Sequence, residues 1–340
     1  MRFTTFVRAV FALAAGVFLL GAAFSAAEAE DKTYVMKVSI PTINDSLHQY
    51  AKNFAAAVEK DSGGRIKGEV YPASQLGSIP RQIEGVQFGA IQCAILPPEF
   101  FVGLDERFEV MAAPGLVTSM DNGEGVATDP AVKKLMFSLG EEKGLHGVAL
   151  FMATPSSIVS KAPIRHLADF KGKKLRVFAS EFQSTALERL GATPVAMTLG
   201  DVLPAIQQGT IDGAIAAVVV YATMHYQDAA KYVTQTGQPS IFLINELSKK
   251  WLATLPPDLP PLLAKDAEEQ ARAIHSFAID FNGKADKMWT DAGGELISLP
   301  PAEQATMLAT LGSVGADVSK NKPKLQEAYG IVTEAAKRTR

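Results

Sequence analysis

The pattern of apolar and polar residues over 34–96 predicts strands and helices in alternation. Three apolar runs have the length of strands and cover residues 34–40, 66–72 and 90–96. Between them, apolar residues recur at helical spacing, at Leu47, Ala51, Phe54 and Val58 and again at Ile79, Ile83, Val86 and Ala90. This β-α-β-α-β order predicts a sheet with helices packed against it.

The same order returns over residues 174–216. Strands are predicted over 174–179, 193–197 and 210–216. The two helices between them end at glycines, Gly191 and Gly209. Residues 87–95 read QFGAIQCAI and residues 207–215 read QQGTIDGAI, so the two regions share a pattern at an offset of 120 residues. We therefore expect two similar α/β lobes.

The pattern from residue 256 to 299 is helical and too long for an ordinary domain helix, so we expect it to lie across both lobes, with a possible kink at Asn282-Gly283. A short helix over 301–311 and a basic helical end over 322–340 follow. The absence of a low-complexity linker indicates that the chain crosses between the lobes more than once. We expect lobe I to comprise residues 30–153 plus about 240–281, and lobe II to comprise residues 154–239 plus about 282–340. A cleft between two such lobes is a common site for a small ligand.

The first 29 residues have the pattern of a secretory signal peptide. Two arginines precede an uncharged apolar run from residue 9 to 24, and Ala27-Glu28-Ala29 forms an A-x-A cleavage site. The run approaches the roughly 17–25 residues of a membrane span, so a membrane anchor is the alternative. The cleavage site and the acidic residues after it favour removal near Ala29, and we expect an exported, periplasmic protein.

Charge and cysteine content narrow the class of partner. Without residues 1–29 the chain has 31 basic and 35 acidic residues, a net charge of −4. This balance argues against a nucleic-acid partner, which would require a basic stripe. The single cysteine, Cys93, lies in an apolar run, so we expect a buried, unreactive thiol rather than a nucleophile. An exported chain without disulfides depends on its core, and this one is long enough for two domains.

The sequence contains no catalytic or metal-binding motif of the common kinds. It has no G-x-S-x-G elbow, no H-E-x-x-H motif and no phosphate-binding P-loop. The five histidines are scattered without the spacing of metal ligands, and no cysteine pair could join them. We therefore expect neither an enzyme nor a bound cofactor or metal.

One charged residue interrupts an apolar strand. Arg176 lies between Leu175 and Val177, where a guanidinium costs several kcal/mol to bury unless an anion meets it. It therefore lies either at a sheet edge in water or beside an anion. Arg176 is near the C-terminal end of the first strand of the second lobe, where open α/β sheets bind ligands. Arginine is also well shaped to grip a carboxylate. The residues alone leave two alternatives open, a ligand anchor and a structural ion pair.

Several segments in fixed order match a known family. The longest is DFKGKKLRVFASEFQSTALERLGATPVAMTLGDVLPAIQQGTIDGA, and the others are GGRIKGEVYPASQLGS, EGVQFGAIQCAI and KYVTQTG. In this order and at this spacing they resemble the substrate-binding proteins of tripartite ATP-independent periplasmic (TRAP) transporters, the DctP-like group. The resemblance covers nearly the whole chain after the signal peptide.

The resemblance implies an α/β protein with the two-lobed periplasmic binding protein fold, with hinge strands and a long lobe-spanning helix. It implies that the arginine of the K-[IL]-R-V motif, Arg176 here, lies in the cleft and pairs with the carboxylate of a small-molecule ligand. It further implies that the lobes close on the ligand and that the closed form delivers it to TRAP membrane permease subunits driven by an ion gradient.

Several positions depart from the family pattern around the ligand. Ala216 stands where most members have an asparagine, Ser156 where many have a second arginine, and Leu199 where an aromatic is usual. In the first lobe, Pro97 follows the buried strand. The pocket is thus expected to have one arginine and few other polar groups, which leaves the polar groups of a sugar acid or dicarboxylate without partners. We therefore predict a small monocarboxylate with an apolar or aromatic body, such as an aromatic acid or a branched 2-oxo acid.

These observations favour a solute-binding protein for the import of an organic acid. The alternative is a periplasmic ligand-sensing module that feeds a signalling receptor. A third interpretation is an exported enzyme on a binding-protein-like fold, which turnover of a bound acid would support.

Overall fold

A five-stranded sheet contains the N-terminal strands of the computed structural model, which describes residues 32–340. Its strand order is β2 (Ile66–Tyr71), β1 (Tyr34–Ser39), β3 (Cys93–Leu96), β10 (Ser240–Ser248) and β4 (Leu145–Pro155). β1 and β3 are parallel, and β10 is antiparallel to β3 and β4. The helices α2 (Ser46–Asp61) and α3 (Ile79–Phe88) connect the first three strands, which confirms the predicted β-α-β-α-β order. The predicted signal peptide, residues 1–29, lies outside the described residues.

A six-stranded sheet contains the second region. Its strand order is β11 (Glu295–Ile297), β9 (Tyr232–Thr234), β5 (Ser157–Ser160), β8 (Gly213–Ala216), β6 (Lys174–Val177) and β7 (Thr193–Ala196). β6 is parallel to both β7 and β8, and β5 is antiparallel to β8 and β9. The helices α6 (Glu181–Arg189) and α7 (Leu199–Gln208) connect β6, β7 and β8. The second predicted β-α-β-α-β run is therefore also confirmed.

The repeated sequence pattern corresponds to equivalent points in the two sheets. Gly89 ends α3 with a φ of 81° and Gly209 ends α7 with a φ of 73°, a left-handed conformation that residues with a Cβ rarely adopt. The strands that follow, β3 and β8, begin at residues 93 and 213 and end at 96 and 216, so they keep the offset of 120 residues. The ends of both strands lead to the same cavity.

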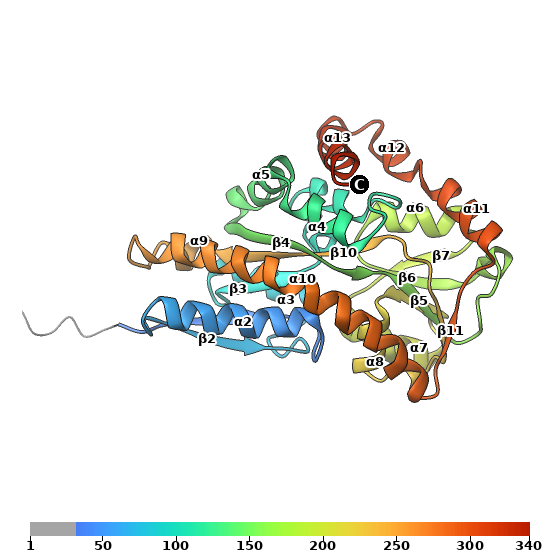
Figure 1. Ribbon diagram of the computed structural model, residues 1–340, viewed down its shortest axis with the longest axis horizontal. Helices are drawn as coiled ribbons and strands as arrows, with labels where there is room; N and C mark the ends of the chain where they lie inside the picture. The colour runs from blue at the N-terminus through green and yellow to red at the C-terminus, as the bar shows by residue number, and fades with distance from the viewer. Residues whose placement is uncertain (1–31) are drawn as a thin grey trace, which may run out of the picture. The chain divides into compact units, whose positions relative to one another are not determined.

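Two short connections and one long helix join the two sheets. β4 ends at Pro155 and β5 begins at Ser157, while β9 ends at Thr234 and β10 begins at Ser240. The helix α10 (Leu259–Asp291) has 33 residues and packs against α2 and β4 of the first sheet and against α8 (Val218–Thr223) (Figure 1). It continues without a break through Asn282-Gly283. The hinge strands and the lobe-spanning helix are thus present, although β4 and β10 are not among the strands that the sequence pattern predicts.

The C-terminal helices contact both halves of the fold. The predicted helix over 301–311 is α11 (Pro301–Leu311), and α12 (Val314–Ser319) and α13 (Pro323–Arg338) follow it. α12 packs against α6, whereas α13 packs against α4 (Met120–Thr128), α5 (Pro130–Ser138) and the 3-10 helix η2 (Glu106–Ala112). The remaining short elements are η1 (Pro98–Phe101), η3 (Glu141–Lys143), η4 (Leu167–Phe170), η5 (Tyr226–Asp228) and α9 (Lys249–Leu252). Because α13 contacts elements of the first half, the boundary of lobe II at residues 282–340 stays a prediction.

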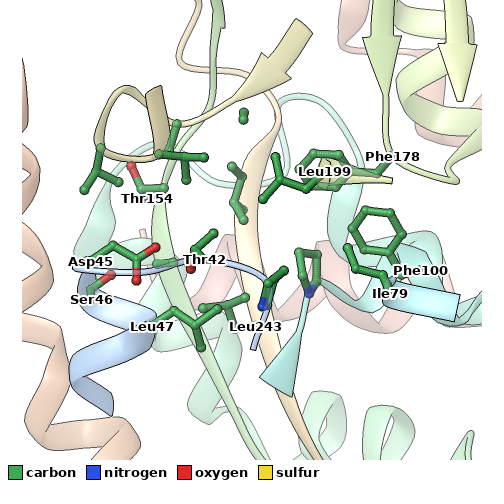
Figure 2. A pocket seen from close by; sticks show the side chains of 18 of the residues that line it. Thr42, Asp45, Ser46, Leu47, Ile79, Phe100, Thr154, Phe178, Leu199 and Leu243 are labelled. Atoms are coloured by element: carbon green, nitrogen blue, oxygen red, sulfur yellow. The ribbon is translucent and has the colours of Figure 1, made fainter. Parts of the chain in front are cut away.

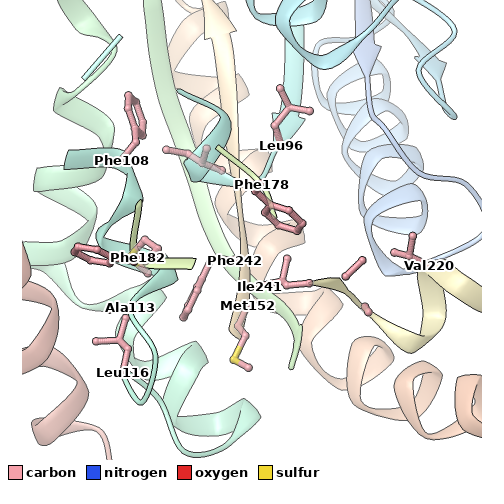
Figure 3. Packing of buried hydrophobic residues seen from close by; sticks show 14 of the residues in the cluster. Leu96, Phe108, Ala113, Leu116, Met152, Phe178, Phe182, Val220, Ile241 and Phe242 are labelled. Atoms are coloured by element: carbon pink, nitrogen blue, oxygen red, sulfur yellow. The ribbon is translucent and has the colours of Figure 1, made fainter. Parts of the chain in front are cut away.

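A continuous apolar core connects the two sheets. Phe108 on η2, Phe182 on α6 and Phe242 on β10 are fully buried and belong to one cluster (Figure 3). Burying a side chain of this size contributes about 1.5–3 kcal/mol. Their shared burial fixes η2 against both α6 and β10. Within residues 32–340, no helix is long and apolar enough to cross a membrane.

Candidate functional site

A cavity of about 60 Å³ lies where the two sheets meet. Pro97 after β3 and Leu243 on β10 contribute its first-sheet wall, and Ala216 on β8 and Leu199 on α7 contribute its second-sheet wall. Open α/β sheets bind ligands at the ends of strands in this way. The exposed surface of the cavity is almost entirely carbon. The site can therefore hold a small apolar group, provided that any charged part of that group finds a partner.

The structure brings four of the five predicted site residues together. Arg176, Leu199, Ala216 and Pro97 all line this cavity. Ser156 does not. It lines a neighbouring pocket with residues of α8 and α10, and its backbone is held by hydrogen bonds to Pro239 and Gly237 across the hinge. Contact with a ligand stays a prediction for all five.

Arg176 is buried inside the second sheet. It is 1% exposed and lies on β6, between the partner strands β7 and β8. Its Nε donates a hydrogen bond to the carbonyl of Met197 at 2.9 Å, and its Nη1 donates one to the carbonyl of Ile215 at 3.0 Å. Its Nη2 has no hydrogen-bond partner among the described residues. Of the two alternatives that the sequence left open, a position at a sheet edge in water is therefore wrong, and the Nη2 group is buried without a partner in the described part of the chain.

Two aromatic rings cover the guanidinium of Arg176. Its Cζ lies 4.5 Å from the centroid of the Phe178 ring and 5.9 Å from that of Phe100. The two rings stack on each other with centroids 5.2 Å apart. Cation–π contacts of this kind stabilise a desolvated charge. They do not replace a counter-ion, and burial lowers the pKa of Arg176 to about 10.

The structural ion pair that the sequence left open is not formed. Among residues 32–340, no carboxylate lies within 4.0 Å of the Arg176 guanidinium. The charge that acts on it from the first half of the fold is that of Glu99, on η1 next to Phe100. Glu99 is fully buried, and neither of its carboxyl oxygens has a hydrogen-bond partner in the described part of the chain. Burial raises the pKa of Glu99 to about 8, so this side chain is largely a neutral acid at pH 7.

Glu99, Phe100 and Phe178 are functional candidates that the sequence did not single out. Phe178 follows β6 directly, and Phe100 comes three residues after Pro97. The available signal was the run Pro97-Pro98-Glu99-Phe100, in which one acid stands among apolar residues directly after a buried strand. Such a charged residue costs free energy when it is buried, which makes its position informative.

Polar side chains gather at the other end of the cavity. Figure 2 shows Thr42, Asp45, Ser46 and Thr154 on one side, with Phe100, Phe178 and Leu199 on the other. Asp45 caps α2 by accepting a hydrogen bond from the backbone N–H of His48 at 2.9 Å. Burial raises the pKa of Asp45. The local role of this carboxylate is thus to begin the helix that borders the cavity.

The described residues offer no arrangement for a metal. No group of three or more His, Cys, Asp or Glu side chains between residues 32 and 340 could hold an ion. Cys93 is buried in β3, its Sγ lies 3.0 Å from Oδ1 of Asn245, and burial raises the pKa of its thiol. A thiol in this environment is a poor nucleophile.

Known proteins share both the sequence pattern and the fold. The protein YiiZ of Salmonella typhimurium strain LT2 is 29% identical over 210 residues, which are 61% of this chain and 63% of that protein. The C4-dicarboxylate-binding periplasmic protein DctP of Rhodobacter capsulatus is 28% identical over 72% of this chain and 73% of its own length. The chain thus spans somewhat less than two thirds of YiiZ.

A solved structure of similar fold is a TRAP periplasmic solute-binding protein from Desulfovibrio salexigens with bound orotic acid. It has a TM-score of 0.85 at 20% sequence identity, over 91% of this chain and all of that one. This likeness confirms the two-lobed fold. Residues 38–321 match the DctP family, described as bacterial extracellular solute-binding protein, family 7. The chain therefore belongs to the DctP family of bacterial extracellular solute-binding proteins.

Proposed function

We propose that this protein captures a small organic acid in the cavity between its two sheets and delivers it to a TRAP membrane permease. The ligand is a monocarboxylate with an apolar or aromatic body, and Arg176 is its carboxylate anchor. The main support for this proposal is that Arg176 is buried with its Nη2 unpaired among the described residues, and that it lines a cavity whose exposed surface is almost entirely carbon.

The energetics of Arg176 support an anion as the missing partner. A buried charge without a counter-ion is unfavourable, and a carboxylate at Nη2 would add a charge-assisted hydrogen bond. Phe100 covers Arg176 from the first half of the fold, whereas Arg176 and Phe178 belong to the second half. Opening between the halves would lift Phe100 away and admit the ligand. Closure would then sequester the carboxylate from water.

The rest of the cavity argues for an apolar body. Leu199, Ala216 and Pro97 present carbon, so a hydroxyl or carboxyl group of the ligand that lies against them would be buried without a partner. The polar side chains at the opposite end, such as Thr42 and Thr154, serve only a ligand group that reaches them. Of the relatives named above, one is named for C4-dicarboxylates and one holds orotic acid, which has a single carboxyl group on a ring with further N–H and C=O groups. The single carboxyl group agrees with one arginine anchor, whereas the ring of orotic acid is more polar than the ligand body proposed here.

A thermal-shift panel tests the ligand class. Benzoate and 3-methyl-2-oxobutanoate represent the proposed acids, and succinate and galacturonate represent dicarboxylates and sugar acids. A ligand at 100 times its Kd stabilises the folded state by about 2.7 kcal/mol, which corresponds to about 5 °C in Tm for a chain of this size. An increase in Tm with succinate or galacturonate, and none with benzoate or 3-methyl-2-oxobutanoate, would refute the proposed ligand class.

A further inference from the structure

Glu99 is a buried acid beside the site that the proposed function assigns to an anion. It lies on η1 between Pro98 and Phe100, and the Phe100 ring covers the Arg176 guanidinium. The charge of Arg176 acts on Glu99, yet the two side chains form no ion pair within 4.0 Å. Both carboxyl oxygens of Glu99 and the Nη2 of Arg176 are buried and lack partners in the part of the chain described. Each of these two charges acts on the other and neither group has a partner, so the absence of an ion pair between them needs an explanation.

A second buried carboxyl nearby shows what Glu99 lacks. Glu109 on η2 accepts hydrogen bonds from the backbone N–H groups of Glu181 and Phe182, at 2.7 and 3.3 Å, and from the Ser180 hydroxyl at 3.1 Å. Those groups form the N-terminus of α6, whose dipole also favours a negative charge. Burial raises the pKa of Glu109 and these three donors act in the opposite direction. Glu99 has no donors from neighbouring residues, and its own backbone N–H lowers its pKa by less than burial raises it, so of the two carboxyls it is the one that keeps a proton.

The groups that face Glu99 are few. The helices and strands packed most closely against η1 are η2, α3 and β10. Their titratable side chains are Glu106, Arg107 and Glu109 on η2, Arg81 and Glu84 on α3, and Glu246 on β10. Among these and the residues of the second sheet, the charges that act on Glu99 are those of Glu109, which raises its pKa, and Arg176, which lowers it. Both effects are smaller than that of burial.

We propose that Glu99 is a specificity-determining residue that must be protonated for an anion to occupy Arg176, so that ligand capture is coupled to proton binding. This inference rests on the proposed function, because it takes the ligand to be a carboxylate at Arg176. A neutral Glu99 leaves the guanidinium to the ligand and does not repel it. An ionised Glu99 would compete for Arg176 and place a second negative charge beside the bound carboxylate. The same arrangement disfavours a ligand with a second carboxylate near Arg176.

The direction and size of the coupling follow from the protonation of Glu99. Its pKa in the free protein is about 8, and a bound anion raises this pKa further. Affinity therefore falls as pH rises through 8, by about tenfold between pH 7 and pH 9 if the bound form stays protonated. Arg176, whose pKa is about 10, keeps about nine tenths of its charge at pH 9 and contributes little to this change.

Isothermal titration calorimetry of the exported protein at pH 6, 7, 8 and 9 tests the coupling. The probes are benzoate and 3-methyl-2-oxobutanoate, both fully ionised over this range. Measurement in two buffers of different ionisation enthalpy gives the number of protons taken up per ligand. The test variant is Glu99→Gln, an isostere of the neutral acid. The matched control is Glu246→Gln, because Glu246 is equally buried and lacks partners, yet no charge from Arg176 acts on it.

The wild-type protein should bind a probe about tenfold more weakly at pH 9 than at pH 7 and should take up about half a proton per ligand at pH 8. The Glu99→Gln variant should bind with a change of less than twofold over this range and no proton uptake, whereas Glu246→Gln should behave as wild type. Binding without proton uptake in the wild type, at an affinity independent of pH, overturns the inference alone. Absence of binding by either probe at every pH overturns the proposed ligand class and the inference together.

Discussion

Replacing Arg176 with methionine separates a ligand anchor from a structural residue. Burial of the guanidinium lowers its pKa from the ordinary value of arginine to about 10, which corresponds to about 3 kcal/mol of unfavourable desolvation. Methionine removes this cost and also the hydrogen bonds to the carbonyls of Met197 and Ile215, which contribute about 1 kcal/mol each. The two changes oppose each other. We therefore expect the unliganded variant to unfold within about 2 kcal/mol of wild type.

Ligand binding should respond very differently. Removal of one partner of a buried charge pair costs about 3–5 kcal/mol, which corresponds to a roughly 100- to 5000-fold loss of affinity. Chemical denaturation measures the first effect and calorimetric titration with benzoate or 3-methyl-2-oxobutanoate the second. The control is Arg189→Met on α6, because Arg189 pairs with Asp317 away from the cavity and its loss should leave the affinity unchanged.

Two results would refute this reasoning about Arg176. A variant that no longer folds, while the Arg189 control does, would assign Arg176 a structural role that its unpaired Nη2 does not suggest. A folded variant that binds the acid within threefold of wild type would place the carboxylate elsewhere.

Three further predictions follow from named contacts. As the pH rises from 5 to 8, the free energy of unfolding of the wild type should fall relative to that of Glu99→Gln by about 1.4 kcal/mol per pH unit. The reason is that the pKa of Glu99 is about 8 in the folded state and 4.5 in the unfolded state, so the folded state holds a proton that the unfolded state releases. Parallel curves from urea titrations of the two proteins would contradict the assignment. The Glu109→Ala variant should lose about 2 kcal/mol, since three donors at the start of α6 lose their acceptor, and an unchanged urea midpoint would show that water replaces it. The Ala216→Asn variant should weaken benzoate binding by about 5- to 150-fold, because an amide in a carbon wall costs about 1–3 kcal/mol. Tighter benzoate binding in calorimetry would contradict an apolar ligand body.

The sequence predicts the two sheets well because their signals are local. A helix that ends at a glycine and continues into an apolar strand occurs at Gly89 and at Gly209, and both recur in the structure at the predicted spacing. The position of Arg176 near the end of β6 follows from the same pattern. Strand alternation does not say which face of β6 is exposed, because the sheet is covered on both sides and Leu175, Arg176 and Val177 are all buried.

The parts that sequence reasoning missed depend on tertiary contacts. The family resemblance places Ser156 at a ligand position. In the structure, its backbone forms hydrogen bonds with Pro239 and Gly237, and the residue lines the neighbouring pocket instead. Burial of Glu99 depends on η1 packing against η2, which no local pattern reports. The helical pattern of α13 likewise predicts an apolar face but not that α4 and α5 cover it.

A crystal structure of the protein purified from its own host, with whatever acid it retains, tests the role of Arg176 most directly. We expect an acid with one carboxyl group in the cavity and a carboxylate oxygen within about 3.2 Å of the Nη2 of Arg176. An acid whose carboxylate is bound by other residues, with Nη2 still unpaired or paired with Glu99, would contradict this role.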